Sequence, residues 1–461
     1  MKRLFVLLIV FFTCMEFNAQ EATPLLTGKV TVSIKEGTFE CDLTLSDIPY
    51  MKKKLFRLNS GMNLLNVRCK KPEDFLLHYK KSMIDTFSTG ESSTYQLTDK
   101  LYPKEIQIRY VGKFPVIGET FDDNNLSMSD WKGNIAFNGY SLRIDGFQSA
   151  WYPIFYDIDK DKAYAKVRYD IELICKDCSM IYINGSKPVE GTKSVFKSDA
   201  PCELAMFIGN YKADSVDGTY FLNPELTKDQ IKELSNLTKR CKKYYESKLK
   251  LFYSQDITYV NTTPTSKRDA WLFVSYPTIM VIGRGENGLK GFFDEKRKDN
   301  FQVFIAHELG HYYFGSYRIF NSTLGDMMTE GFTEYLALRA AKDVISKEIF
   351  EKRVKEKIEA LDKFQPIPFY KINSQSEYRN RELYVYYYAP IIFLAIEKEI
   401  GEKRMWQWLQ NILQLKQTFT DYVFLTSTLK EILNNDKLFE LIQTKYFQSE
   451  NSIQNAIDKI N

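Results

Sequence analysis

The sequence predicts a multidomain chain in which a β-rich N-terminal part is followed by an α+β part that ends in a helical bundle. With 461 residues, the chain is too long for one ordinary core. Alternating apolar and polar residues are concentrated before about residue 200, and helical spacing prevails after about residue 300. Strands followed by helices indicate an α+β second domain. We expect domains at 21–198, 199–345 and 346–461, after a leader of twenty residues.

The leader, residues 1–20, has the pattern of a secretory signal peptide. Lys2 and Arg3 precede an apolar run from Leu4 to Phe12, which is too short to span a bilayer, and Ala19 supplies a small residue near the end. We therefore predict export to the periplasm or the extracellular space. An alternative is a membrane-tethered lipoprotein with its lipid on Cys14. No later segment is apolar enough to cross a membrane.

The β-rich part extends from about residue 28 to residue 183. Four segments alternate between apolar and polar residues: Lys29–Ile34, Glu40–Leu45, Glu105–Tyr110 and Lys166–Leu173. Asn-Gly pairs at 138–139 and 184–185 are typical of turns between such strands. Long helical periods are scarce here. The pattern predicts an antiparallel β-sandwich or β-saddle.

The second part begins after about residue 200. Residues 227–252 have helical spacing, and Thr227 stands in the N-cap position. Short strands are expected around Ile257–Val260, Ala270–Ser275 and Ile279–Ile282. From Asn300 to its end the chain is almost wholly helical in pattern. This order of elements predicts the α+β domain and its helical bundle.

Charge and cysteine usage exclude some classes of function. The 63 basic and 59 acidic residues are spread along the chain and give a net charge of +4, so short basic clusters are interpreted as solvated faces rather than nucleic-acid sites. Six cysteines follow the leader, and in an exported chain they permit disulfides. Cys175 and Cys178 are expected to form a local disulfide or to remain plain turn cysteines, rather than a metal or redox site.

Two of the three histidines stand in the run His-Glu-Leu-Gly-His from His307 to His311. Asp299 with Gln302 predicts a capping box at the start of a helix that carries this run. Residues i and i+4 lie one above the other on a helix, so both imidazoles can reach one ion. Glu308 lies beside them and can deprotonate water. The pattern predicts a Zn²⁺ site with one ion per chain, against the alternative of two ordinary histidines on an amphipathic helix.

A catalytic zinc site needs a third protein ligand and an open position. Glu330 supplies the ligand, with eighteen residues between it and His311. Gly331 is expected to permit close approach of this second helix to the first. Glu334, one turn further on, is interpreted as an exposed carboxylate or an outer partner rather than a ligand. Spacing alone leaves Asp326 as a further candidate ligand.

At this point the sequence resembles the alanyl aminopeptidase-like gluzincins, a family that includes leukotriene-hydrolysing enzymes. Their ligand glutamate, in Asn-Glu-Gly-Phe-Ala, follows the same eighteen-residue gap, and here residues 329–333 read Thr-Glu-Gly-Phe-Thr. After His311 the chain keeps an aromatic residue and the family's glycine, Gly315. Residues 386–401 are similar to the family helix that opens with a catalytic tyrosine. Weaker similarities to the family lie in the β-rich part, at Trp151-Tyr152-Pro153 and Asp161-Lys162-Ala163.

The resemblance implies two further site residues. Tyr386, fifteen positions before Gly401, takes the place of the tyrosine that hydrogen-bonds the oxyanion, although a crowd of tyrosines in a helix is usually a packing feature. Glu286 lies 21 positions before His307, in Gly-Arg-Gly-Glu-Asn, which resembles the family strand whose glutamate binds the substrate's free amine. The alternative for this glycine-rich segment is an ordinary hairpin turn.

The resemblance also implies a fold and an activity. The fold is a β-saddle followed by a thermolysin-like zinc peptidase domain with a helical extension. The activity is that of an exported zinc metallopeptidase, a hydrolase acting on peptides as an aminopeptidase. Three alternatives stay open: a zinc endopeptidase on the same site, a hydrolase of another substrate, and an inactive peptidase-like binding protein.

Overall fold

The computed structural model describes residues 23–69, 75–82, 92–99, 103–117, 133–160, 162–262, 271–283, 286, 288–417 and 419–461. The predicted leader with Cys14 lies outside these residues. Asp161, Ala270, Arg284, Gly285 and Asn287 lie outside them too. Within the described part, no helix combines the length and the apolar character needed to cross a membrane.

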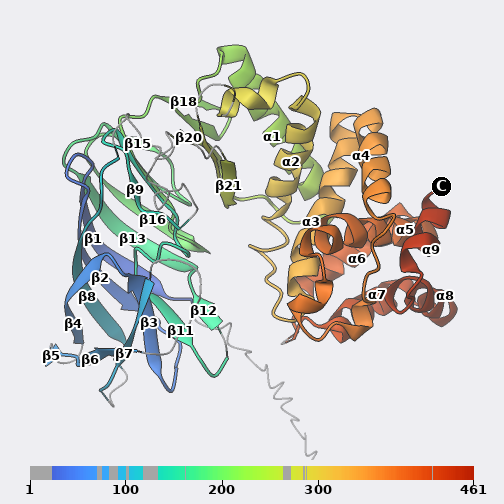
Figure 1. Cartoon of the computed structure of the whole chain (residues 1–461), viewed down its shortest axis with the longest axis horizontal. Coiled ribbons are helices and arrows are strands. Elements are labelled where there is room, and N and C mark those ends of the chain that lie inside the picture. The colour runs from blue at the N-terminus through green and yellow to red at the C-terminus, as the bar shows by residue number, and fades with distance from the viewer. Residues whose placement is uncertain are drawn as a thin grey trace, which may run out of the picture.

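The N-terminal part consists of three sheets, which lie together on one side of the molecule (Figure 1). The largest has the strand order β16 (Lys193–Cys202), β13 (Val167–Cys175), β1 (Leu25–Ser33), β2 (Thr38–Ser46), β8 (Glu105–Lys113), β4 (Met62–Cys69) and β5 (Phe75–Leu76). The second has the order β12 (Lys162–Tyr164), β11 (Ile154–Asp157), β3 (Lys54–Asn59), β7 (Ser92–Leu97) and β6 (Tyr79–Lys81). The third has the order β15 (Val189–Glu190), β14 (Met180–Ile183), β17 (Met206–Gly209), β10 (Ser141–Ile144) and β9 (Ala136–Phe137).

The strands predicted from alternation are present. In β13 every second side chain is buried from end to end, which is the pattern of a strand with one face on a core. In these three sheets, the strand pairs within the described residues are antiparallel except for β1 and β13, which pair in parallel. Cys175 and Cys178 form the local disulfide that was one of the two expected outcomes. The thiols of Cys41, Cys202 and Cys241 are free and buried, and Cys69 is buried as well.

A fourth sheet connects the two parts. Its order is β18 (Ala213–Val216), β19 (Thr219–Leu222), β20 (Ile257–Thr262), β22 (Thr278–Ile282) and β21 (Trp271–Ser275). A buried cluster that includes Tyr182, Phe207 and Met280 joins this sheet to the third one. The Asn184 side chain donates to the carbonyls of Ser275 and Tyr276 across the same junction, at 2.8 and 3.0 Å. The two parts therefore share buried apolar and polar contacts.

The helices lie beside the sheets. They are α1 (Lys228–Leu249), η3 (Leu289–Phe293), α2 (Lys298–Gly310), α3 (Gly325–Ala340), η4 (Ala341–Ile345), α4 (Lys347–Ala360), η5 (Phe369–Lys371), η6 (Gln375–Tyr378), η7 (Leu383–Tyr388), α5 (Ala389–Ile400), α6 (Glu402–Gln414), α7 (Tyr422–Leu433), α8 (Asp436–Ile442), η8 (Gln443–Phe447) and α9 (Ser452–Ile460). In Figure 1, α2 and α3 are on the side of the bundle that faces the strands. Lys166, from the β-rich part, donates to the carbonyl of Gly315 at 2.6 Å, which ties the sheets to the loop after α2.

The two predicted helix starts have different outcomes. Thr227 caps α1, and its capping box with Gln230 is complete. The capping box predicted at Asp299 is wrong, because α2 begins at Lys298 and Arg297 before it makes no side-chain cap. The backbone carbonyl of Asp294 accepts hydrogen bonds from the backbone amides of Arg297 and Lys298, and the turn that they form leads directly into the helix. No extended N-cap residue precedes the first turn, and a capping box requires one.

Candidate metal centre

Two adjacent helices place three metal-ligating side chains at one point. His307 lies in the last turn of α2, His311 is the C-cap residue of the same helix, and Glu330 lies in α3. One ligand atom from each of them lies within 4.8 Å of the other two. Among the residues that the structure describes, this is the only group of three such side chains with this arrangement. The spacing read from the sequence thus brings together the three expected residues.

The carboxylate of Glu330 is aimed between the two imidazoles. Its Oε2 atom lies 3.3 Å from Nε2 of His307 and 3.4 Å from Nε2 of His311. This oxygen is buried and has no hydrogen-bond partner. An unsatisfied buried carboxylate oxygen is costly unless a cation or another donor completes it. Two imidazoles and one carboxylate are also a donor set that suits zinc, so the residues fit a Zn²⁺ ion.

The pKa shifts at this point reflect the same excess of negative charge. Burial opposes protonation of His307, but the carboxylates of Glu330 and Glu334 outweigh it and raise the pKa of the imidazole to about 10. Burial alone would raise the pKa of Glu330. The two imidazoles lower it by more than burial raises it, so the pKa of this carboxyl lies well below its usual range. The centre therefore favours a positive charge between these groups.

The far side of each imidazole is fixed by an acceptor. Nδ1 of His307 lies 2.7 Å from Oε2 of Glu334, and Nδ1 of His311 lies 3.1 Å from the carbonyl of Phe314. An acceptor at Nδ1 holds the proton there and leaves Nε2 available to a metal. Glu334 thus lies outside the group of three and contacts His307 from the other side, as expected of an outer partner, whereas the alternative of an exposed carboxylate is wrong because the side chain is buried. Its other oxygen lies 2.6 Å from Nζ of Lys357 in α4.

Glu308 lies beside the two histidines but outside the group of three candidate ligands. Its Oε2 atom is 3.9 Å from Nε2 of His311, and it is not part of the group of three. Burial raises the pKa of Glu308, partly offset by the two imidazoles. A carboxylate with a raised pKa next to a cation site is suited to accept a proton and to give it back.

Asp326, which spacing left as a candidate ligand, is engaged elsewhere. Arg381 donates to both of its carboxylate oxygens, with Nε–Oδ2 at 2.7 Å and Nη2–Oδ1 at 2.6 Å. Such a bidentate pair engages both oxygens of the carboxylate. Nη2 of Arg381 also lies 3.5 Å from Oε1 of Glu330, the carboxylate oxygen that does not face the histidines.

Tyr386 is the tyrosine of its segment that lies at the metal centre. Its ring centroid is 5.7 Å from that of His307, and the segment η7 that carries it is a π-helix. The Tyr384 hydroxyl instead donates to the carbonyl of Ile367 at 2.7 Å. The Tyr388 hydroxyl is buried and pairs with Ser452 at 2.8 Å. Tyr384 and Tyr388 are therefore packing residues. Their positions distinguish them from Tyr386, which the sequence alone could not do.

The glycine that permits the close approach of α2 and α3 is not the expected one. A Cβ atom on Gly331 would lie 2.8 Å from Cβ of Ala389, so this glycine makes room for α5 and not for α2. Gly310 faces α3, where a Cβ atom would lie 3.0 Å from Cγ2 of Thr333. The expectation for Gly331 was wrong because the two faces of a helix cannot be assigned to neighbours from spacing alone.

Glu286 is exposed and follows β22, which ends four residues earlier at Ile282. The placement of Glu286 within a strand is therefore wrong. Its carbonyl accepts a hydrogen bond from Arg297 at 2.9 Å. Among the described residues, Glu286 is not in the group formed by the three ligand side chains.

Two site residues, Lys357 and Arg381, were missed from the sequence. Lys357 is one of many lysines in α4, and only its burial distinguishes it, with 3% of the side chain exposed. Arg381 lies five residues before Tyr386, and no motif marks it. Both are recognised only by their contacts in space.

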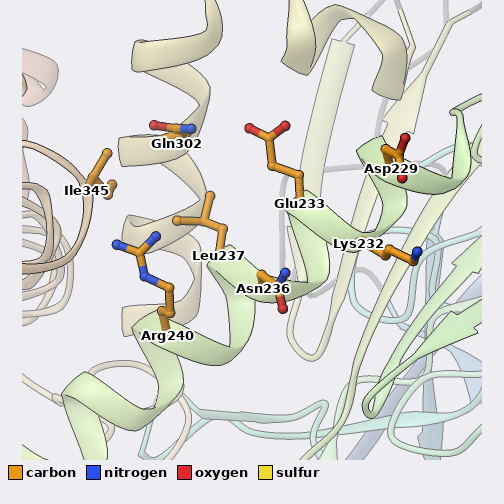
Figure 2. A pocket seen from close by; sticks show the side chains of 8 residues that line it. All are labelled: Asp229, Lys232, Glu233, Asn236, Leu237, Arg240, Gln302 and Ile345. Carbon is orange, nitrogen blue, oxygen red and sulfur yellow. The ribbon is translucent and has the colours of Figure 1, made fainter.

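A separate pocket of about 420 Å³ lies over α1 and the start of α2 (Figure 2). Six of its lining residues come from α1, and Gln302 and Ile345 complete it. Its charged side chains have both signs, including Glu233 and Arg240, and Lys298 lies 2.6 Å from Glu233. None of the predicted site residues lines this pocket, so it is not part of the metal centre.

Comparisons with known proteins bear on the fold. No family model matches the chain, and no curated protein matches it by sequence. Solved structures are similar. Yeast leukotriene A4 hydrolase in complex with bestatin has a TM-score of 0.63 at 12% identity, over 92% of this chain and 67% of that one. The native enzyme from Saccharomyces cerevisiae has a TM-score of 0.63 at 13% identity, with the same coverage.

A bacterial structure is similar over nearly its whole length. An M1 zinc metallopeptidase from Deinococcus radiodurans has a TM-score of 0.59 at 11% identity, and 92% of this chain aligns with 93% of that one. At identities this low the likeness shows the fold. The fold class predicted from the sequence is therefore confirmed, with β-sheets first and a helical C-terminal region last.

Proposed function

We propose that this chain is an exported zinc metallopeptidase, and more specifically an aminopeptidase that removes N-terminal residues from peptides. The observation that carries the proposal is the buried, unpartnered Oε2 atom of Glu330 aimed between His307 and His311. The fold likeness supports it, since the similar structures include M1 zinc metallopeptidases, one of them bound to a Tyr-Ser-Ala substrate.

In this proposal His307, His311 and Glu330 hold one zinc ion. When bound, the ion supplies Lewis-acid polarisation of the scissile carbonyl and acidifies water. Glu308 accepts a proton at its carboxylate as water attacks, and later gives the proton to the leaving amine. Tyr386 donates a hydrogen bond to the oxygen on which negative charge develops. Glu334 keeps the His307 ring oriented throughout.

Glu286 is proposed to hold the free α-ammonium of the substrate. An anion placed one residue away from the reacting carbonyl would align the first peptide bond with the metal centre. In support, Glu286 is exposed, in a segment between β22 and the helix that carries the histidines. Glu286 is exposed, so this pair is strong only when a bound substrate covers it from water; in that state, loss of the carboxylate costs several kcal/mol.

Domain limits and location complete the proposal. We assign residues 21–198 to a β-saddle domain, 199–345 to a thermolysin-like zinc peptidase core and 346–461 to its helical part. The leader pattern supports export to the periplasm or outside the cell, with Cys14 as an alternative lipid attachment site. A mature N-terminus near residue 20, found by mass spectrometry of protein from the native cell, tests the location. Intact Met1 on that protein would contradict it.

The activity is tested with matched aminoacyl and N-acetylated peptide substrates, each with and without a chelator. The proposal predicts chelator-sensitive release of single N-terminal residues, poor cleavage of N-acetylated peptides, and a severe loss on Glu286→Ala with unchanged metal content. Internal cleavage of N-acetylated peptides with little effect of Glu286→Ala would identify an endopeptidase instead. No cleavage of either substrate class by a zinc-loaded protein would favour an inactive, peptidase-like binding protein.

A further inference from the structure

Arg381 is held rigidly at the edge of the metal centre. It lies between η6 and η7, and its bidentate pair with Asp326 fixes the plane of the guanidinium. About half of its side chain is exposed, at 52%, while Asp326 is largely covered, at 17%. The guanidinium therefore has one edge, Nε and Nη2, that is fixed by Asp326 and a second edge, at Nη1, that lies outside this pair.

The second edge of this guanidinium reaches the proposed oxyanion donor. Nη1 of Arg381 lies 3.5 Å from the Tyr386 hydroxyl, and the guanidinium carbon lies 5.5 Å from the centre of the same ring. A guanidinium has five N–H donors and no acceptor, so in this contact the Tyr386 oxygen must accept. The phenolic proton is then donated in another direction, which in this structure is toward the Glu330 carboxylate.

We propose that Arg381 is a positioning residue that presents the Tyr386 hydroxyl as a hydrogen-bond donor to the oxyanion formed in peptide hydrolysis. This inference rests on the proposed function. The oxyanion donor must be aimed before charge develops, because a preorganised donor costs no reorganisation at the moment of reaction. Arg381 fixes the orientation of the Tyr386 hydroxyl in two ways: it donates to the hydroxyl oxygen, and its guanidinium lies over the ring.

The local charges argue against a different role, the capture of a substrate carboxylate. Arg381 already faces two carboxylates, since Asp326 pairs with it and Oε1 of Glu330 lies 3.5 Å from Nη2. The Asp326 carboxylate alone balances the single positive charge of the guanidinium. A substrate carboxylate would therefore meet no uncompensated positive charge on Arg381. Donor orientation needs no surplus positive charge.

The kinetic test is a double-mutant cycle between Arg381 and Tyr386. Arg381→Gln should lower kcat by roughly 10- to 100-fold with little change in KM, the range expected for losing a hydrogen bond to a charged group. In a Tyr386→Phe background the same change should cost less than about 2-fold, because the hydroxyl it acts on is absent. Equal losses in both backgrounds would overturn the inference. A rise in KM confined to peptides with a free C-terminal carboxylate would also overturn it, in favour of a carboxylate anchor.

Two controls separate positioning from general damage. Arg379 lies two residues earlier and is exposed, and its guanidinium donates to the carbonyl of Gln365, so Arg379→Gln should leave kcat unchanged. Zinc affinity, measured by competition with a chelator, should be the same in wild type and Arg381→Gln. A loss of zinc affinity that matches the loss of kcat would assign Arg381 to the metal site and overturn a role through Tyr386.

A structural readout tests the positioning of Tyr386 by Arg381 even if the protein cleaves no peptide. Crystal structures of wild type and Arg381→Gln should show the Tyr386 hydroxyl held against Nη1 in the first and displaced in the second. An unchanged Tyr386 in the variant would overturn the positioning role. Failure of the proposed function appears separately, as a wild type that keeps the Arg381–Tyr386 contact but binds no zinc or cleaves no substrate.

Discussion

Nδ1 of His307 lies 2.7 Å from Oε2 of Glu334, and both side chains are buried. The other oxygen of Glu334 lies 2.6 Å from Nζ of Lys357, which also donates to the carbonyl of Tyr386 at 2.7 Å. One chain of contacts thus connects a proposed metal ligand in α2, a carboxylate in α3, an ammonium in α4 and the backbone of the proposed oxyanion donor. Helices α2, α3 and α4 are thereby fixed relative to the metal centre.

Glu334→Ala should weaken zinc binding without removing a ligand. Outer partners of metal-bound histidines are worth about 10- to 100-fold in metal affinity, and Glu334 is the partner of His307. Chelator competition should show a loss in this range. Glu359→Ala is the matched control, because Glu359 is a largely exposed carboxylate in α4 that contacts Lys355. Equal zinc affinity in Glu334→Ala and wild type would show that the His307–Glu334 contact does not support the metal.

Lys357→Met should destabilise the folded protein. Burial lowers the pKa of Lys357, while Glu334 raises it, and the ammonium neutralises a buried carboxylate. Removing one partner of a buried ion pair leaves an uncompensated charge and costs about 3–5 kcal/mol. Urea unfolding measures the change. Lys355→Met, at an exposed pair with Glu359, should lie within about 0.5 kcal/mol of wild type. Comparable losses in both variants would show that burial of the pair has no special energetic role.

Glu308→Gln should keep the metal and lose activity. Glu308 is outside the group of three ligand side chains, so its charge is not needed to hold the ion. The amide cannot accept the proton from water, and general base catalysis contributes about 10²- to 10⁴-fold. Turnover and zinc content are measured on the same sample. Retained turnover would show that another group takes the proton.

Tyr386→Phe should lower kcat by about 10²- to 10³-fold with little change in KM, the usual cost of one oxyanion donor. Tyr384→Phe and Tyr388→Phe are controls from the same segment, because their hydroxyls bond to Ile367 and Ser452 and not to the metal centre. Each control should lower the free energy of unfolding and leave kcat close to the wild-type value. A fall in kcat for Tyr384→Phe or Tyr388→Phe comparable to that expected for Tyr386→Phe would place the oxyanion donor elsewhere in the segment.

The features that the sequence predicted well depend on short-range periodicity. Alternation located β1, β2, β8 and β13, and the spacing of Thr227 and Gln230 located the capped start of α1. The two histidines come together because they stand four residues apart on one helix. Glu330 joins them because α2 and α3 pack closely, and the resemblance to the gluzincins supplied the spacing at which that occurs.

The features that the sequence did not predict depend on contacts between distant elements. Asp299 has the right neighbours for a capping box, but a turn at Asp294 starts the helix earlier. Gly331 faces α5 because the bundle packs on that side of α3. Lys357 and Arg381 reach the centre from α4 and from the segment before η7. The sequence near these two residues carries no motif, so only the packing of the bundle reveals them.

The zinc content of the purified protein tests the central claim most directly. Elemental analysis of wild type should find about one zinc per chain, because two imidazoles and one carboxylate converge on one point. The variants His311→Ala and Glu330→Ala should hold far less, while Glu308→Gln should hold as much as wild type. Zinc-free wild type, or full occupancy in both ligand variants, would contradict the assignment of His307, His311 and Glu330 as the metal centre.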